Sequence, residues 1–131
     1  MKKRVLIADT DEQFRNELVT AIETFDEFEV AGVADGAEML KTATEKKPDI
    51  IILDLLLPHY DGLTVLDLIC VQNAECKAFV VTGFFSDYIM SALSARGVSA
   101  LLKKPCPVQC VVDLLKEALR QETVPIQEKT S

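Results

Sequence analysis

The sequence predicts an α/β domain in which a parallel β-sheet is covered by helices on both faces. Short apolar runs alternate along the whole chain with longer amphipathic stretches, which is typical of repeated βα units. A chain of 131 residues that is 49% hydrophobic and 27% charged has the size and composition of one folded domain. This composition excludes intrinsic disorder and low-complexity fibres.

Five short apolar runs are the candidate strands, at residues 5–8, 28–33, 50–53, 78–81 and 99–102. The first helix is indicated by apolar residues at helical spacing, namely Phe14, Leu18, Ile22 and Phe25. The last helix carries a longer stripe of the same kind, formed by Val108, Val111, Val112, Leu115 and Leu119.

Turn signals separate these elements. Asp35-Gly36 and Asp61-Gly62 mark the starts of the second and third helices, and Gly97 marks the end of the fourth. Five βα units therefore fill a domain over residues 1–121. Residues 122–131 are polar and lack apolar periodicity, so we expect a tail or the stump of a linker there.

The composition also excludes several classes of function. The chain has 14 basic and 21 acidic residues and a net charge of -7, so it should repel a phosphate backbone, and direct nucleic-acid binding is not expected. No apolar stretch approaches the ~20 residues of a membrane span, and no export signal precedes the first strand. We expect a cytoplasmic protein whose four cysteines are reduced and hold no zinc.

Polar side chains follow four of the five predicted strands. In chain order they are Asp9-Thr10-Asp11, Asp54, Thr82-Gly83 and Lys103-Lys104-Pro105. In an open parallel sheet the functional crevice lies beyond the carboxyl ends of the strands, so these side chains form the candidate site. Two carboxylates about 4 Å apart repel by roughly 1 to 4 kcal/mol, which favours a hard cation between them, and Mg2+ prefers such oxygen ligands.

This set of side chains is suited to phosphoryl transfer. A cation and the ammonium of Lys104 neutralise developing charge, the hydroxyl of Thr82 binds a phosphoryl oxygen, and the carboxylate of Asp54 attacks to form an aspartyl phosphate. Taken singly, each residue type also has an ordinary role, as a helix cap or in a turn. Their order and placement together favour the functional role.

The motifs resemble the receiver domain of two-component response regulators, over about residues 3–121. The matching residues are Asp9, Leu53-Asp54-Leu55-Leu56-Leu57-Pro58 with Asp61-Gly62, Val81-Thr82-Gly83 and Lys104-Pro105. Residues 58–63 and Ala8-Asp9 look closest to the receiver of the sporulation stage 0 transcription factor family. The resemblance implies a flavodoxin-like (βα)5 doubly wound sandwich, with a five-stranded parallel sheet of order 2-1-3-4-5.

The resemblance also implies roles for individual residues. Asp54 aligns with the phosphoacceptor, Thr82 with the switch hydroxyl and Lys104 with the phosphate-binding lysine, whose bond to the following proline is often cis. Mg2+ would be held by Asp9, Asp54 and the backbone carbonyl of Leu56. Such a domain assists its own phosphorylation and dephosphorylation but is a signalling domain rather than an enzyme.

Partners follow from the same resemblance. The phosphoryl donor would be a phosphohistidine on a histidine kinase or histidine phosphotransferase. Phosphorylation would favour a homodimer through the fourth helix, fifth strand and fifth helix, a face that includes Ile89, Met90, Leu93 and Ala100. DNA would be bound only through an output domain that this chain does not contain.

Several positions depart from the family pattern. Thr10 replaces an acidic residue that usually ligates the metal, so affinity should fall unless Asp11 takes its place. Leu101 stands where an aromatic switch residue is common, and Cys106 stands where Phe often follows Lys-Pro. We interpret His59, in the loop after Asp54, as polar surface.

Two other functions compete with this interpretation. Ala8-Asp9-Thr10-Asp11 also resembles the DxD motif of haloacid dehalogenase-like phosphatases, with Asp9 as nucleophile and Asp11 as general acid, but that leaves Asp54 without a role. The second alternative, suggested by Thr10 and Leu101, is a receiver-like module that binds a partner with little or no phosphorylation.

Overall fold

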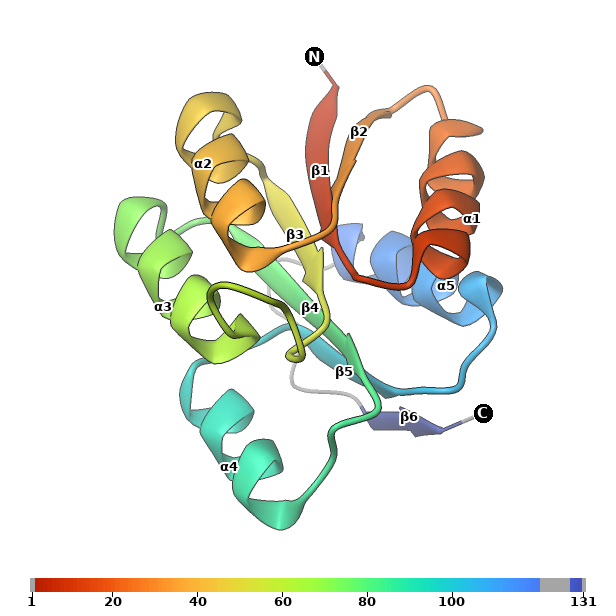
Figure 1. The fold of residues 1–131 in the computed structure, drawn as a ribbon. Helices are drawn as coiled ribbons and strands as arrows, with labels where there is room; N and C mark the ends of the chain where they lie inside the picture. The colour runs from red at the N-terminus through yellow and green to blue at the C-terminus, as the bar shows by residue number, and fades with distance from the viewer. Residues whose placement is uncertain (1, 121–127, 131) are drawn as a thin grey trace.

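Strands and helices alternate as predicted in the computed structural model of the protein, which describes residues 2–120 and 128–130 (Figure 1). The strands are β1 (Lys3–Ala8), β2 (Phe28–Val33), β3 (Ile50–Leu53), β4 (Lys77–Thr82), β5 (Ala100–Lys103) and β6 (Glu128–Thr130). The helices are α1 (Glu12–Glu23), α2 (Gly36–Lys46), α3 (Gly62–Gln72), α4 (Asp87–Ala95) and α5 (Val108–Leu119). The five predicted strands are all present, and two of them have the predicted bounds.

The sheet is parallel and has the order β2-β1-β3-β4-β5-β6. The predicted order 2-1-3-4-5 and the flavodoxin-like topology are therefore confirmed. The addition is β6, which pairs with the edge of β5 where the sequence predicted only a polar tail. Residues 122–127 and 131 of that predicted tail lie outside the described residues.

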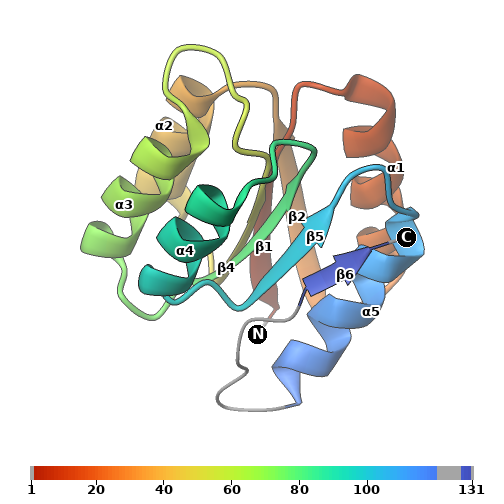
Figure 2. The same ribbon diagram turned by 90° about the horizontal axis from the view of Figure 1, so that it is seen from below.

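Two apolar layers hold the helices against the sheet, because alternate strand residues point to opposite faces. On one face Leu6, Ile51 and Val80 belong to a core that also contains buried residues of α2, α3 and α4. On the other face Ile7 and Ile52 belong to a core shared with α1 and α5. Figure 2 shows these two helical layers on either side of the sheet.

Short polar residues begin four of the five helices. The side chains of Asp11, Asp35, Asp61 and Ser86 each accept a hydrogen bond from a backbone amide in the first turn of their helix. Gly97, predicted to end α4, has a φ of 69° and follows the last helical turn, a conformation that glycine adopts without steric cost. Among the described residues, no helix is both long and apolar enough to cross a membrane.

Candidate functional site

The sheet brings the predicted site residues together at its carboxyl edge. β1 and β3 are neighbours in register, with Ala8 opposite Leu53, so the next residues, Asp9 and Asp54, lie side by side. The amide of Asp54 donates to the carbonyl of Ala8 over 3.0 Å, which extends the strand pairing up to the site. The two carboxylates are buried, with 3% of Asp9 and 7% of Asp54 exposed.

The carboxylate of Asp54 is held by three hydrogen-bond donors. Its Oδ1 accepts from the hydroxyl of Thr82 over 2.7 Å and from the amide of Leu56 over 3.1 Å. Its Oδ2 accepts from Nζ of Lys104 over 2.9 Å. Thr82 is fully buried at the end of β4. The hydroxyl of Thr82 and the ammonium of Lys104, both predicted to lie beside Asp54, therefore contact its carboxylate.

Lys104 links the two carboxylates. Its Nζ also donates to Oδ2 of Asp9 over 2.6 Å and lies 4.8 Å from the centre of the Phe14 ring. Burial alone would lower the pKa of Lys104, but the hydrogen bonds to Asp9 and Asp54 outweigh it and raise that pKa above its usual value. The ammonium is therefore charged at neutral pH. The peptide bond between Lys104 and Pro105 is cis.

The environment of Asp9 differs from that of an exposed carboxyl. Burial raises the pKa of Asp9, and the hydrogen bonds from Lys104 and from the amide of Asp11 oppose that rise. The guanidinium of Arg15 donates to the carbonyl of Asp9 over 2.7 Å and fixes the backbone at this point. The ammonium of Lys104 thus lies between the two carboxyl groups.

Other predicted residues are placed differently. Asp11 caps α1 by accepting from the amide of Phe14, and Thr10 beside it is exposed. Leu56 is exposed, while Leu101 is fully buried in the core. His59 is exposed with Nδ1 3.4 Å from a carboxylate oxygen of Asp35, which agrees with its interpretation as polar surface.

The thiols and the proposed dimer residues also have ordinary environments. All four cysteines are free and half-buried. Of the residues assigned to the dimer face, Ile89, Leu93 and Ala100 are buried in the core and Met90 packs against it. The exposed aromatic residue of α4 is Tyr88, 75% of which is accessible.

Gly62 brings the start of α3 against the segment that follows Asp54. Its amide donates to the carbonyl of Leu55 over 2.9 Å. A Cβ at this position would lie 2.5 Å from the Cα of Leu55 and 2.8 Å from the carbonyl oxygen of Asp54. Only glycine permits this approach, so the Asp61-Gly62 motif positions the backbone of the loop that follows Asp54 as well as beginning a helix.

The oxygen ligands present fit a hard cation in part. Asp9, Asp54 and the carbonyl of Leu56 would supply oxygen atoms, and water can complete the shell of Mg2+. Within the described part of the chain, however, no three His, Cys, Asp or Glu side chains are grouped so that they could hold a metal. The third carboxylate is missing because Thr10 is neutral and Asp11 is used as a helix cap.

Sequence reasoning missed three contacts of this site. The amide of Leu56 donates to Asp54, the ring of Phe14 lies against Lys104, and the amide of Phe84 donates to the hydroxyl of Thr82 over 3.1 Å. The last contact has a sequence signal, because a threonine at a strand end often accepts from the amide two residues later. The Phe14 contact joins distant segments and has no such signal.

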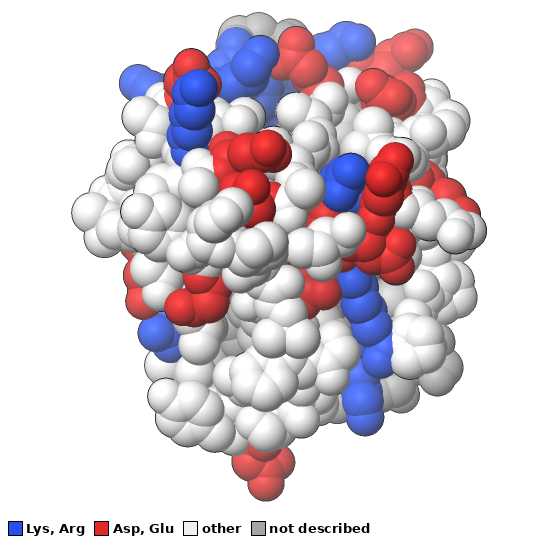
Figure 3. All heavy atoms as spheres, in the orientation of Figure 1, with Lys and Arg blue, Asp and Glu red and all other residues white. Residues whose placement is uncertain are grey.

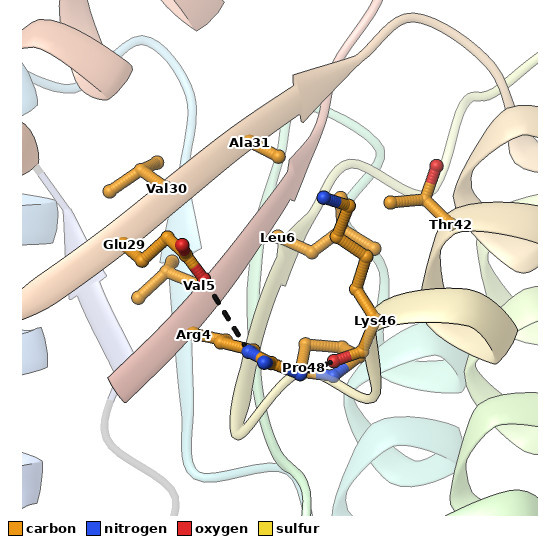
Figure 4. Close-up of a pocket in the computed structure, with 9 residues that line it drawn as sticks. All are labelled: Arg4, Val5, Leu6, Glu29, Val30, Ala31, Thr42, Lys46 and Pro48. Carbon is orange, nitrogen blue, oxygen red and sulfur yellow. Dashed lines mark hydrogen bonds and ion pairs between the residues drawn. The ribbon is translucent and has the colours of Figure 1, made fainter. Parts of the chain in front are cut away.

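The hollow drawn in Figure 4 lies elsewhere. It has a volume of about 240 Å³ and is lined by residues near the amino ends of β1 and β2 and by α2, at the opposite end of the sheet from Asp54. Its Arg4 is already paired with Glu29 and with the carbonyl of Lys46. Figure 3 shows charges of both signs over the upper part of one face and a largely uncharged area over α4.

Comparisons with known proteins agree with this geometry. The family profile described as response regulator receiver domain matches residues 5–122. The chain is 31% identical over 120 residues to the transcriptional regulatory protein LiaR of Bacillus subtilis, covering 91% of this chain and 57% of LiaR. It is 31% identical over 125 residues to the response regulator protein VraR of Staphylococcus aureus, covering 95% of this chain and 60% of VraR.

Solved structures agree on the fold. A CheY-like receiver domain protein from Methanospirillum hungatei superposes with a TM-score of 0.84 at 24% identity, covering 93% of this chain and 97% of that one. The chain thus spans nearly all of that structure but less than two thirds of LiaR and VraR.

Proposed function

This chain belongs to the response regulator receiver domain family, and we propose that Asp54 is its phosphoacceptor. Receiver domains are signalling domains that interact with histidine kinases. The supporting observation is the carboxylate of Asp54, which is held at the end of β3 between the hydroxyl of Thr82 and the ammonium of Lys104. Both donors can also hydrogen-bond to the oxygens of an incoming phosphoryl group and stabilise the negative charge on them.

Transfer would proceed by attack of an Asp54 oxygen on the phosphorus of a phosphohistidine. The bond from phosphorus to the imidazole nitrogen breaks, and the imidazole leaves with the bonding electrons. Lys104 stays charged and binds a phosphoryl oxygen, while Thr82 donates to another. The donor would be a histidine kinase or a histidine phosphotransferase. The same residues would also assist loss of the phosphoryl group.

A bound Mg2+ would neutralise charge on the phosphoryl oxygens in this site. Asp9, Asp54 and the carbonyl of Leu56 would hold it. Because Thr10 supplies no carboxylate, the affinity should be lower than in receivers with a complete acidic pair.

The output of this domain is inferred from its longer relatives. LiaR is named as a transcriptional regulatory protein and is longer than this chain. By analogy, DNA binding would require a separate output domain, and phosphorylation would favour a homodimer through α4, β5 and α5. A closer relation to the sporulation stage 0 receiver depends only on residues 58–63 and Ala8-Asp9.

The test is incubation with acetyl phosphate and Mg2+ followed by intact-mass measurement. We expect the mass of one labile phosphoryl group in the wild type and in Asp67→Asn, an exposed control carboxylate that pairs with Arg96. The addition should be absent in Asp54→Asn. Loss in Asp9→Asn with retention in Asp54→Asn would instead support the haloacid dehalogenase-like phosphatase.

The second candidate is a receiver-like binding module. Thr10 and the lack of a grouped third acidic side chain among the described residues favour it. Absence of any phosphoryl addition to the wild type, at millimolar Mg2+ and with a folded protein, would establish this alternative over the phosphoacceptor.

A further inference from the structure

The ring of Phe14 is a third contact of the Lys104 ammonium, beside its two carboxylate partners. Nζ of Lys104 lies over the ring, 4.8 Å from its centre, and a cation within about 6 Å of an aromatic face is attracted to it. The same Nζ donates to Asp9 over 2.6 Å and to Asp54 over 2.9 Å. An ammonium has three hydrogens, so these two hydrogen bonds leave a third hydrogen available for the ring.

The first turn of α1 fixes the position of this ring. The amide of Phe14 donates to the side chain of Asp11, which caps the helix. The guanidinium of the next residue, Arg15, donates to the carbonyl of Asp9 over 2.7 Å. The Phe14 ring also packs against the core that α1 shares with α5. The ring is therefore carried by a helical turn that is itself attached to the site.

Lys104 has space to move away from Asp54. Next to the ammonium is an open hollow of about 290 Å³, which is lined by Asp11, Phe14, Lys104, Pro105 and Cys106. The side chain of Lys104 is already 20% exposed. Its ammonium is strongly hydrated and sits on a flexible stem, so water in the hollow competes with the site for it. Attraction to the Phe14 ring favours the conformation in which Nζ stays beside Asp54.

Building on Asp54 as phosphoacceptor, we propose that Phe14 is a positioning residue for Lys104. The face of its ring holds the ammonium at the carboxyl edge of the sheet before a phosphoryl group arrives. Lys104 is then in place to bind a phosphoryl oxygen as the bond from Asp54 to phosphorus forms. This role depends on the charge distribution of the ring and not on its apolar volume, so leucine cannot replace it.

The first experiment needs no phosphorylation. Exchange of the Lys104 ammonium hydrogens with water is measured by NMR of the Nζ group in the wild type, Phe14→Leu and Phe14→Tyr. We expect exchange to be about two- to fivefold faster in Phe14→Leu, the factor for losing one lysine–ring contact. Phe14→Tyr keeps an aromatic face and should exchange near the wild-type rate. Equal rates in the wild type and Phe14→Leu would overturn the proposal.

Phe25→Leu is the matched control. The ring of Phe25, just beyond the end of α1, lies 4.0 Å from Nζ of Lys116. The substitution therefore removes the same kind of contact at the opposite end of the helix from Asp54. We expect the Lys104 ammonium to exchange at the wild-type rate in this variant, with circular dichroism confirming that each variant is folded.

The second experiment follows phosphorylation by acetyl phosphate and Mg2+ as intact mass over time. Phe14→Leu is compared with a protein in which a trifluorinated phenylalanine replaces Phe14. Fluorination keeps the ring and its packing but withdraws negative charge from the ring face. We expect both proteins to be phosphorylated about two- to fivefold more slowly than the wild type, and Phe25→Leu at the wild-type rate.

The outcomes separate this inference from the phosphoacceptor itself. If the wild type is phosphorylated and the trifluorinated protein reacts equally fast, packing alone explains the ring, and the inference is overturned while Asp54 remains the phosphoacceptor. Equal slowing in Phe25→Leu would also overturn it, because the effect would not be specific to Lys104. A wild type that gains no phosphoryl group overturns the phosphoacceptor and this inference together.

Discussion

Replacing Gly62 by alanine tests how the structure positions the backbone that follows Asp54. The new Cβ would lie 2.5 Å from the Cα of Leu55 and 2.8 Å from the carbonyl oxygen of Asp54. Both are backbone atoms, so neither can rotate away, and the forced shift should cost about 1–3 kcal/mol. The greater helix propensity of alanine returns at most about 1 kcal/mol. We therefore expect a net loss of about 1–2 kcal/mol in the free energy of unfolding.

Gly83→Ala is the matched control, because it makes the same change in another loop of the site. Its Cβ would find only the Cβ of Lys104, at 3.9 Å, and the φ of Gly83 is not positive. This variant should be neutral or more stable by about 0.4–1 kcal/mol, since alanine restricts the unfolded chain.

The assay is urea unfolding followed by circular dichroism, with the free energies extrapolated to water. We expect Gly62→Ala to be the less stable variant by about 2 kcal/mol, and to accept a phosphoryl group from acetyl phosphate more slowly because the backbone of Asp54 must move. Equal stability of the two variants would show that the close approach of Gly62 to Leu55 has no energetic consequence.

Three further predictions concern charge and thiol chemistry. Thr10→Asp should tighten Mg2+ binding by about tenfold or more in calorimetry, because it adds a carboxylate beside Asp9, and an unchanged affinity would mean that this position does not face the cation. The difference in the free energy of unfolding between the wild type and Lys104→Gln should be constant from pH 7 to 10 and shrink as the pH rises further. The reason is that the pKa of Lys104 is raised above 10.5, so its ammonium loses its charge only above that pH. A difference that already falls at pH 8 in denaturant melts would contradict this pKa. Burial raises the pKa of Cys76 to about 12, so about 10⁻⁴ of this thiol is ionised at pH 8, and mass mapping should find it among the slowest to react with iodoacetamide in the folded protein; rapid labelling would refute its protection.

Local patterns predicted most of the secondary structure. Strands β2 and β3 have the predicted bounds, whereas β4 and β5 extend one residue further, to Thr82 and Lys103. The residue at which a strand ends depends on its hydrogen bonds to the neighbouring strand, and an apolar pattern in the sequence carries no information on those bonds. The short β6 was missed because its three polar residues carry no strand pattern, and its register with β5 is not contained in the sequence pattern.

Competition between structural and chemical roles explains the outcome at Asp11. The sequence analysis predicted Asp11 as a substitute metal ligand. The same carboxylate caps α1, where its Oδ1 accepts a hydrogen bond from the amide of Phe14 over 3.1 Å. The apolar residues assigned to a dimer face belong to the core, and helical spacing alone does not distinguish a core residue from an interface residue. Ile89 and Leu93 of α4 are buried within the domain.

The order of residue types along the chain determined the α/β class, the family and the identity of the side chains at the strand ends, because these depend on local periodicity and on which residue follows each strand. The distances decide what those side chains do. Only the packed sheet places Lys104 between Asp9 and Asp54 and brings the hydroxyl of Thr82 to the carboxylate of Asp54. These contacts join residues that are 28 to 95 positions apart, so they depend on the tertiary fold and not on any local pattern.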